Sequence, residues 1–263
     1  MNNNFVIYTA LFGNYDNLMD PCEDYEGCDF ICFTDQKDLH SNIWNIVVID
    51  EIDLAPNMMN RRYKILPHLF LEKYNISLYV DSNIKIIKNP KILIEKYLKD
   101  TKIALPRHFA RNCLYDEAVK VVEDKKAAEE DVDKQIDFYK KENFPPNFGL
   151  AENNIIFREH NDKEIVVLMQ EWWQLLNRYT QRDQLSLMYL LWKHKVKFSL
   201  MQESARGSDY FRIQIHLDRY KKKTLLATLI NSKNEYILNH PNGVVSFLNK
   251  QIFRMKNLLK KYI

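Results

Sequence analysis

The fold of this chain is decided by residues 61–84, which read RRYKILPHLFLEKYNISLYVDSNI. Apolar residues at helical spacing in the first half predict a helix, with Asn60 as its N-cap and with a kink or restart at Pro67. The second half contains Ile76–Val80, a short apolar run typical of a strand that is buried on both faces. The run stops abruptly at Asp81. Because open α/β sheets bind ligands at the carboxyl ends of their strands, we expect the polar residues that begin there to face a ligand.

Three earlier segments also have the composition of strands: Phe5–Ala10, Cys28–Asp35 and Trp44–Ile49. Strands that alternate with helices and are followed by polar residues favour a parallel arrangement. We therefore predict a Rossmann-like α/β fold, with a mostly parallel central sheet flanked by helices. The loop after the first strand contains Gly13, and it is either a nucleotide-binding loop or an ordinary turn with this glycine at positive φ.

The composition argues against several classes of protein. Apolar residues make up 46% of the 263 residues and aromatic residues 13%, which is enough for a large core and excludes wholesale disorder. A net charge of +3 is too small to indicate nucleic acid as a partner. The five glycines form neither Gly-x-Gly-x-x-Gly nor a P-loop, so classical dinucleotide-binding folds and ATPases are disfavoured.

The sequence also predicts location and domain organisation. It contains no signal peptide pattern, no apolar run long enough to cross a bilayer and no zinc-site spacing among its four cysteines, which favours a cytoplasmic protein with free thiols. We expect one α/β domain over residues 1–205 and a C-terminal helical extension over residues 206–263. Within this extension, His216 is either a third metal ligand or a structural histidine. Residues 244–263 predict a basic amphipathic helix that packs on the main domain, on a partner, or peripherally on an anionic membrane surface.

Candidate binding residues follow the predicted strands. Asp81 and Asn83 are two residues apart, so their oxygens point the same way and suit a metal ion, unless they only stabilise a turn through Asx hydrogen bonds. Arg107 and His108 follow a predicted strand near residues 102–105. Their cationic donors suit a diphosphate, and the alternative is a solvated basic loop.

Two further polar clusters lie later in the chain. Glu152 and Asn153 precede a predicted strand at Ile155–Phe157, and they either bind hydroxyl groups or form a plain turn. Thr180 and Asp183 fit a capping box at the start of a helix, in which the aspartate bonds back to the cap.

Several segments together resemble a known family. They occur in the order of residues 8–16, 28–35, 62–68, 107–108, 157–161 and 182–186. In combination they look like the glycosyltransferase-like family long called domain of unknown function 616, which includes plant proteins implicated in polysaccharide synthesis. The resemblance covers roughly residues 5–200. More distantly, residues 64–83 are similar to the helix, strand and Asp-x-Asp segment of family 8 glycosyltransferases.

The resemblance implies a GT-A fold, a nucleotide-diphosphate-sugar donor and a divalent metal, Mn²⁺ or Mg²⁺. By position, Asp81 and Asn83 would hold the metal, whereas Asp183 and Gln184 would be catalytic and face the transferred sugar. Asp183 would stabilise developing positive charge, act as a base, or accept hydrogen bonds from the donor. Asn83 stands where the wider class has a second aspartate, and its uncharged amide should lower the affinity for metal.

The resemblance also implies a set of donor-binding residues. Besides the Asp81–Asn83 pair, these are Thr9, Phe12, Tyr15, Asp35, Arg61, Arg62, Lys64, Ser82, Arg107, His108, Glu152, Asn153 and Arg182. Among them Thr9, Tyr15 and Asp35 would line the nucleoside. Arg61 or Arg62 would meet the phosphates, together with Lys64, Arg107 and His108.

The first hypothesis is therefore a glycosyltransferase that moves a sugar to a glycan or lipid-linked acceptor, in the synthesis of a surface polysaccharide such as capsule or lipopolysaccharide. Asn83 motivates an alternative, a non-catalytic module that binds a nucleotide sugar or glycan within a biosynthetic complex. A nucleotidyltransferase is a third hypothesis, and it would need a Gly-rich triphosphate loop that this sequence lacks.

Overall fold

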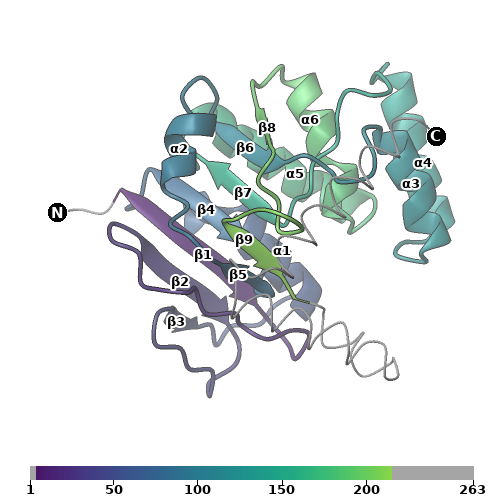
Figure 1. The fold of residues 1–263 in the computed structure, drawn as a ribbon. Helices are drawn as coiled ribbons and strands as arrows, with labels where there is room; N and C mark the ends of the chain where they lie inside the picture. Colours follow the sequence, from purple (N-terminus) through teal and green to yellow (C-terminus); the bar gives the residue numbers. More distant parts are fainter. Residues whose placement is uncertain (1–3, 215–263) are drawn as a thin grey trace.

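The computed structural model describes residues 4–214, and within them a seven-stranded sheet forms the centre of the fold (Figure 1). The strands lie in the order β3-β2-β1-β4-β7-β6-β8. Their bounds are β1 (Phe5–Leu11), β2 (Asp29–Thr34), β3 (Asn45–Val48), β4 (Ile76–Val80), β6 (Ile103–Pro106), β7 (Ile155–Arg158) and β8 (Ser199–Met201). β7 runs antiparallel to β4 and β6, and the other neighbours pair in parallel. The predicted Rossmann-like α/β class, with a mostly parallel central sheet, is confirmed.

Helices cover both faces of this sheet (Figure 1). Their bounds are α1 (Pro56–Ile65), α2 (Ile92–Tyr97), α3 (Leu114–Glu123), α4 (Glu129–Lys141), α5 (Lys163–Arg178) and α6 (Leu187–Lys193), with single 3₁₀ turns η1 (Pro67–Leu69) and η2 (Asp183–Leu185). A second, two-stranded sheet is formed by β5 (Ile84–Ile86) and β9 (Phe211–Ile213), which pair antiparallel.

The central strands lie at the apolar runs from which they were predicted. These runs are apolar because both faces of the strands are buried. All seven residues of β1 are buried. Val6 and Tyr8 belong to the apolar cluster that includes α1 and α5, whereas Phe5 and Ile7 belong to the cluster that includes α2, β5 and β9. This alternation follows from the period of two in a strand, and it explains why the sequence of a doubly covered strand is almost continuously apolar.

The predicted start of the helix before β4 is wrong. α1 begins at Pro56, five residues before the expected first turn, and Ala55 occupies the N-cap position. Proline is favoured in the first turn of a helix because its missing N–H has no helical partner there. Asn60 instead lies inside the helix, where its Oδ1 accepts a hydrogen bond from the Phe12 N–H at 3.2 Å. The predicted restart at Pro67 is confirmed, since η1 begins at that residue.

Most of the predicted C-terminal extension lies outside the described residues. β9 lies in the segment predicted as an extension, and it returns to pair with β5 beside the main sheet. The boundary near residue 205 stays a prediction. His216 and the amphipathic helix predicted over residues 244–263 lie outside the described residues.

Two further expectations concern cysteines and membrane spans. The four cysteines Cys22, Cys28, Cys32 and Cys113 are free thiols, as predicted. Across residues 4–214, the structure contains no helix with the length and apolar character that a bilayer span requires.

Candidate functional site

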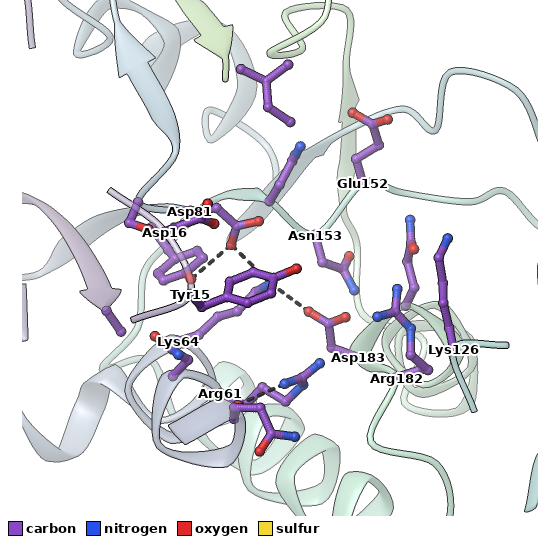
Figure 2. Close-up of a pocket in the computed structure, with 18 of the residues that line it drawn as sticks. Tyr15, Asp16, Arg61, Lys64, Asp81, Lys126, Glu152, Asn153, Arg182 and Asp183 are labelled. Carbon is purple, nitrogen blue, oxygen red and sulfur yellow. Dashed lines mark hydrogen bonds and ion pairs between the residues drawn. The ribbon is translucent and has the colours of Figure 1, made fainter. Parts of the chain in front are cut away.

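A cavity of about 1220 Å³ opens at the carboxyl edge of the central sheet. β1 and β4 are parallel neighbours, so Phe12–Asp16 and Asp81–Ser82, which follow them, reach the same edge. β7 runs in the opposite direction, so residues 152–154, which precede it, reach that edge as well. α1, α3, η2 and the segments that contain His108 and Arg206 also contribute to the wall. Arg61, Lys64 and Asp183 are labelled in Figure 2. The predicted position of the site, outside the carboxyl ends of the strands, is the position of this cavity.

The cavity brings together most of the residues predicted for the site. Those that line it are Phe12, Tyr15, Arg61, Lys64, Asp81, Ser82, His108, Glu152, Asn153, Arg182, Asp183 and Gln184. Thr9, Asp35, Arg62, Asn83 and Arg107 do not belong to the lining.

One cation joins two carboxylates at the floor of the cavity. The Nζ atom of Lys64, in the last turn of α1, lies 2.6 Å from Oδ2 of Asp183 and 3.6 Å from Oδ1 of Asp81 (Figure 2). Tyr79 donates its hydroxyl proton to the same Asp81 oxygen, over 2.9 Å. The Lys64 side chain is only 8% exposed, so water screens these ion pairs weakly.

Asp183 is an ionised carboxylate in an almost closed environment. Burial favours its neutral form, but the positive charges of Lys64, Arg61 and Arg182 outweigh burial and hold the pKa of Asp183 well below its usual range. A carboxylate with so low a pKa is a weak base. It is suited to stabilising a neighbouring positive charge.

The predicted capping box at Thr180 is wrong. The Thr180 hydroxyl donates to Oε1 of Gln135 in α4 at 2.7 Å, and the Asp183 carboxylate is taken by Lys64. The 3₁₀ turn η2 begins at Asp183. Trp172 in α5 is completely buried. Its indole N–H donates to the Asp183 carbonyl at 3.1 Å, and this hydrogen bond fixes the turn to α5.

Two guanidinium groups of the lining form no direct ion pair with a carboxylate of residues 4–214, although their charges act on Asp183 from a distance. Arg61 donates to the carbonyl of Asn57 at 2.8 Å, and neither Arg61 nor Arg182 forms an ion pair with a described acid. Arg62 differs, because its Nη1 donates to both carboxylate oxygens of Asp53 at 2.9 Å. Of the two arginines that the sequence left open, Arg61 is therefore the one that faces the cavity.

The loop after β1 is held by a residue predicted to bind the nucleoside. Asp35 accepts the backbone N–H of Gly13 with both carboxylate oxygens, at 3.0 and 3.1 Å. Gly13 has a φ of +69°, the conformation expected of an ordinary turn, and it also lines the cavity. Asp35 thus shapes this loop from outside the cavity.

The other residues outside the lining have distinct surroundings. Thr9 is completely buried within β1. Asn83 is buried beside β5, where its Nδ2 donates to the carbonyl of Gln214 at 2.9 Å. Arg107 is exposed, and its backbone N–H donates to the Met201 carbonyl at 3.0 Å. Their predicted roles in donor binding stay predictions.

The sequence missed an ion pair on the other side of the cavity. Arg206 donates from Nε to Oε1 of Glu152 at 2.7 Å, and its guanidinium carbon lies 4.2 Å from the centre of the Phe109 ring. Burial raises the pKa of Glu152, although Arg206 and Asn154 act in the opposite direction. Arg206 lies beyond β8 and outside every segment of the family pattern, so no motif singled it out. Phe109 could have been found from its position next to His108.

Carboxylate oxygens for a divalent cation are available in the cavity from Asp81 and from Asp16. Asp81 faces the cavity with a side chain that is 35% exposed, and Asp16 from the loop after β1 is a further carboxylate of the lining. Within residues 4–214, no group of three His, Cys, Asp or Glu side chains is arranged to hold a metal. Mg²⁺ is commonly bound by one or two carboxylates together with the phosphates of a substrate, so this donor set fits a metal that arrives with a nucleotide.

Solved structures offer a weak comparison. The apo structure of the bifunctional glycosyltransferase WbbM has 9% sequence identity and a TM-score of 0.43, and the match covers 75% of this chain and 38% of that chain. The apo structure of mouse xyloside xylosyltransferase 1 has 10% identity and a TM-score of 0.40, covering 75% of this chain and 84% of that one. With TM-scores below 0.5, neither structure adds to the argument.

Sequence comparison is more informative. A relative from Arabidopsis thaliana, described as the probable hexosyltransferase MUCI70, is 28% identical over 273 residues. The match covers 92% of this chain but 44% of the relative, so the chain spans less than half of that protein's length. The family model of the TOD1/MUCI70 glycosyltransferase-like domain matches residues 1–216, which include the whole sheet and every residue of the cavity. The chain therefore belongs to the TOD1/MUCI70 glycosyltransferase-like domain family.

Proposed function

We propose that this protein is a glycosyltransferase that transfers a sugar from a nucleotide-diphosphate donor to a glycan or lipid-linked acceptor. The observation that carries the proposal is the pair Arg61 and Arg182, two guanidinium groups that form no direct ion pair with a described carboxylate and line the same cavity as the ionised Asp183. Family membership supports the reaction class. The acceptor's place in a surface polysaccharide and the cytoplasmic location stay predictions.

The cations serve the leaving group. Transfer breaks the bond between the anomeric carbon and the diphosphate, and the electron pair of that bond leaves with the diphosphate. An acceptor hydroxyl oxygen forms the new bond to the anomeric carbon, and its proton is released to the solvent. Arg61 and Arg182 neutralise the charge that develops there, because a guanidinium group offers a planar set of donors to phosphate oxygens. Fixed cations need little reorganisation during this step.

Asp183 serves the sugar. Positive charge develops on the anomeric carbon as the diphosphate departs, and an ionised carboxylate stabilises it. Because Lys64 and the two arginines keep the pKa of Asp183 low, we assign it this electrostatic role rather than that of a base. Gln184 lies next to it in the lining, where its Nε2 donates to the Ala151 carbonyl at 3.3 Å and its amide oxygen can accept from donor hydroxyls.

Asp81 would hold a divalent cation. When bound, Mn²⁺ or Mg²⁺ would polarise the phosphoryl oxygens and withdraw charge from the leaving group. We assign Tyr15, a residue that is 49% exposed and lines the cavity, to the nucleoside (Figure 2).

The proposal is tested with a panel of UDP, GDP, ADP and dTDP and their sugar conjugates, with and without Mn²⁺. A ligand at 100 times its Kd raises the stability of the folded state by about 2.7 kcal/mol, which corresponds to a rise in Tm of about 5–10 °C. We expect one base to give this shift, and the matching sugar conjugate to release nucleoside diphosphate in the presence of wild-type protein. Asp183→Asn should keep binding and lose release.

The outcomes separate the candidate functions. Binding without release by the wild-type protein, across metals and sugar acceptors, would establish the non-catalytic module instead. An unchanged Tm with every nucleotide would overturn both readings of the cavity as a nucleotide site.

A further inference from the structure

The segment Phe157–Asn161 belongs to the family pattern, yet none of its residues lines the cavity. Its side chains instead reach the connection between α1 and β4. The Arg158 guanidinium donates to the Lys64 carbonyl, and Nε2 of His160 lies 3.0 Å from the Leu71 carbonyl. Nδ2 of Asn161 donates to the carbonyls of Glu72 and Tyr74, at 3.0 and 2.7 Å. The end of β7 and the residues after it therefore fix the main chain of residues 64–74 through side-chain hydrogen bonds, on the side away from the cavity lining.

Arg158 is the unusual member of this segment. It is completely buried, and it forms no ion pair with a carboxylate within residues 4–214. Its guanidinium donates to the Lys64 carbonyl and to the Tyr8 hydroxyl, and it contacts Sδ of Met169 at 2.9 Å. A buried charge without a counter-ion is costly, so its partners must compensate.

The Lys64 carbonyl is a suitable compensating group. It lies in the last turn of α1, where carbonyls have no helical partner and carry the negative end of the helix dipole. Tyr8 also donates its hydroxyl proton to this carbonyl, at 3.0 Å. The main chain of Lys64 is thus fixed from two directions by side chains of the central sheet.

The side chain of Lys64 is equally constrained. Its ammonium lies between Asp183 and Asp81, and it is 5.1 Å from the centre of the Tyr79 ring. A displacement of the Lys64 main chain would therefore move the ammonium relative to both carboxylates.

We propose that Arg158 is a positioning residue: by binding the Lys64 carbonyl, it sets the position of the Lys64 ammonium between Asp81 and Asp183. The geometric part of this inference stands on the contacts alone. Its consequence for donor binding rests on the proposed function.

The test observes the Nζ–H signal of the Lys64 ammonium by NMR, in protein labelled with ¹⁵N-lysine. We expect wild-type protein to show a slowly exchanging Nζ–H signal from Lys64, which Lys64→Arg removes and thereby assigns. Arg158→Met keeps a long unbranched side chain and removes the charge. It should shift or broaden this signal. Asn161→Ala is the matched control, because it loosens the same connection without touching Lys64, and it should leave the signal in place.

Two results would overturn the proposal. One is an unchanged Lys64 signal in Arg158→Met. The other is an equal change in Asn161→Ala, which would mean that any loosening of the connection has the same effect. Should Arg158→Met fail to fold, Tyr8→Phe removes one of the two hydrogen bonds to the carbonyl, and the same criteria apply to it.

Affinity for the nucleoside diphosphate that binds wild-type protein is the second readout. Outer partners that orient metal ligands are worth about tenfold or more in affinity. We expect a similar factor for a partner that orients Lys64, so Arg158→Met should weaken binding about tenfold and Asn161→Ala should not. Equal affinities for Arg158→Met and wild-type protein would overturn the effect on donor binding. A wild-type protein that binds none of the nucleotides would overturn the proposed function, while the NMR signal still decides whether Arg158 positions Lys64.

Discussion

The Nζ atom of Lys64 lies 2.6 Å from Oδ2 of Asp183, a residue 119 positions later in the sequence. The pair joins the last turn of α1 to η2, and Asp81 at the end of β4 lies 3.6 Å from the same ammonium. Three elements that converge on the cavity are thus linked by a single cation. The ion pairs therefore matter for the shape of the site as well as for its charge.

Replacing Lys64 by methionine should destabilise the protein. Asp183 would be left with a side chain only 13% exposed and without its nearest cation. Breaking a buried ion pair by removing one partner costs about 3–5 kcal/mol, because the remaining charge is uncompensated. Urea unfolding at pH 7 measures this loss.

A double-mutant cycle tests the explanation. Asp183→Asn in the Lys64→Met background removes the stranded charge and should recover part of the lost stability. Losses that simply add in the double variant would show that the two side chains do not interact.

The sequence predicts the sheet well and the details of the site less well, for a physical reason. Burial on both faces leaves a continuous apolar run, so β1 and β4 are visible in the sequence. The capping box at Thr180 was predicted from local sequence, but in the structure both of its side chains bind residues far away in the sequence. Gln135 binds the threonine hydroxyl and Lys64 binds the aspartate. Contacts between residues so far apart leave no periodic signal.

The orientation of the two neighbouring arginines of α1 is another detail that local sequence does not determine. Consecutive helical residues point about 100° apart, and here Arg61 lines the cavity whereas Arg62 binds Asp53 outside it. The sequence does not fix the rotation of the helix, because the Asp53 carboxylate that binds Arg62 lies in the preceding loop. The strand-end position of Asp81, in contrast, follows from the strand itself, and it was predictable.

Arg61→Gln should weaken the binding of nucleoside diphosphate, whereas Arg62→Gln should not. A charge-assisted hydrogen bond to phosphate contributes about 1.5–3 kcal/mol, so Arg61→Gln should raise the Kd about tenfold or more. Arg62 is paired with the exposed Asp53, and losing such a surface pair changes stability by about 1 kcal/mol or less. Isothermal titration of the two variants compares adjacent positions on one helix. Equal losses of affinity would contradict the assignment of Arg61 to the cavity.

Gly13→Ala should distort the loop after β1. An alanine at a φ of +69° is strained by about 1–2 kcal/mol, and its Cβ would lie 3.1 Å from the Pro56 Cβ. We expect the Tm to fall by about 3–6 °C and the nucleotide affinity to decrease, because the loop lines the cavity.

Gly27→Ala is the control for backbone strain. Gly27 also has a positive φ, of +74°, and the nearest atom to an added Cβ is the mobile Nζ of Lys91. It lies outside the cavity lining, so its replacement should lower the Tm and leave nucleotide affinity unchanged. A similar loss of affinity in both variants would mean that Gly13 acts only through global stability.

Acid should destabilise the protein through His160 before its carboxylates are protonated. Burial lowers the pKa of His160 to about 4, with Arg158 and His68 acting in the same direction and the Leu71 carbonyl opposing them. In the unfolded chain the pKa returns to 6.5. Between these values the unfolded state binds more protons than the folded state, so stability is complete above pH 6.5 and falls as the pH is lowered towards 4. The total loss is up to about 3 kcal/mol, since one pKa unit corresponds to about 1.4 kcal/mol.

The pH range in which stability is lost distinguishes His160 from Asp183. The lowered pKa of Asp183 adds stability that is lost only when the pH falls below the ordinary range of an aspartate, so its contribution is separate from that of His160. Burial and the charge of Arg158 also lower the pKa of His68, and this adds to the loss in the same window. Urea unfolding at several pH values from 7.5 to 4.5 should show a steeper decline for wild-type protein than for His160→Gln, which cannot take up the proton. Parallel declines would assign the acid sensitivity to other groups.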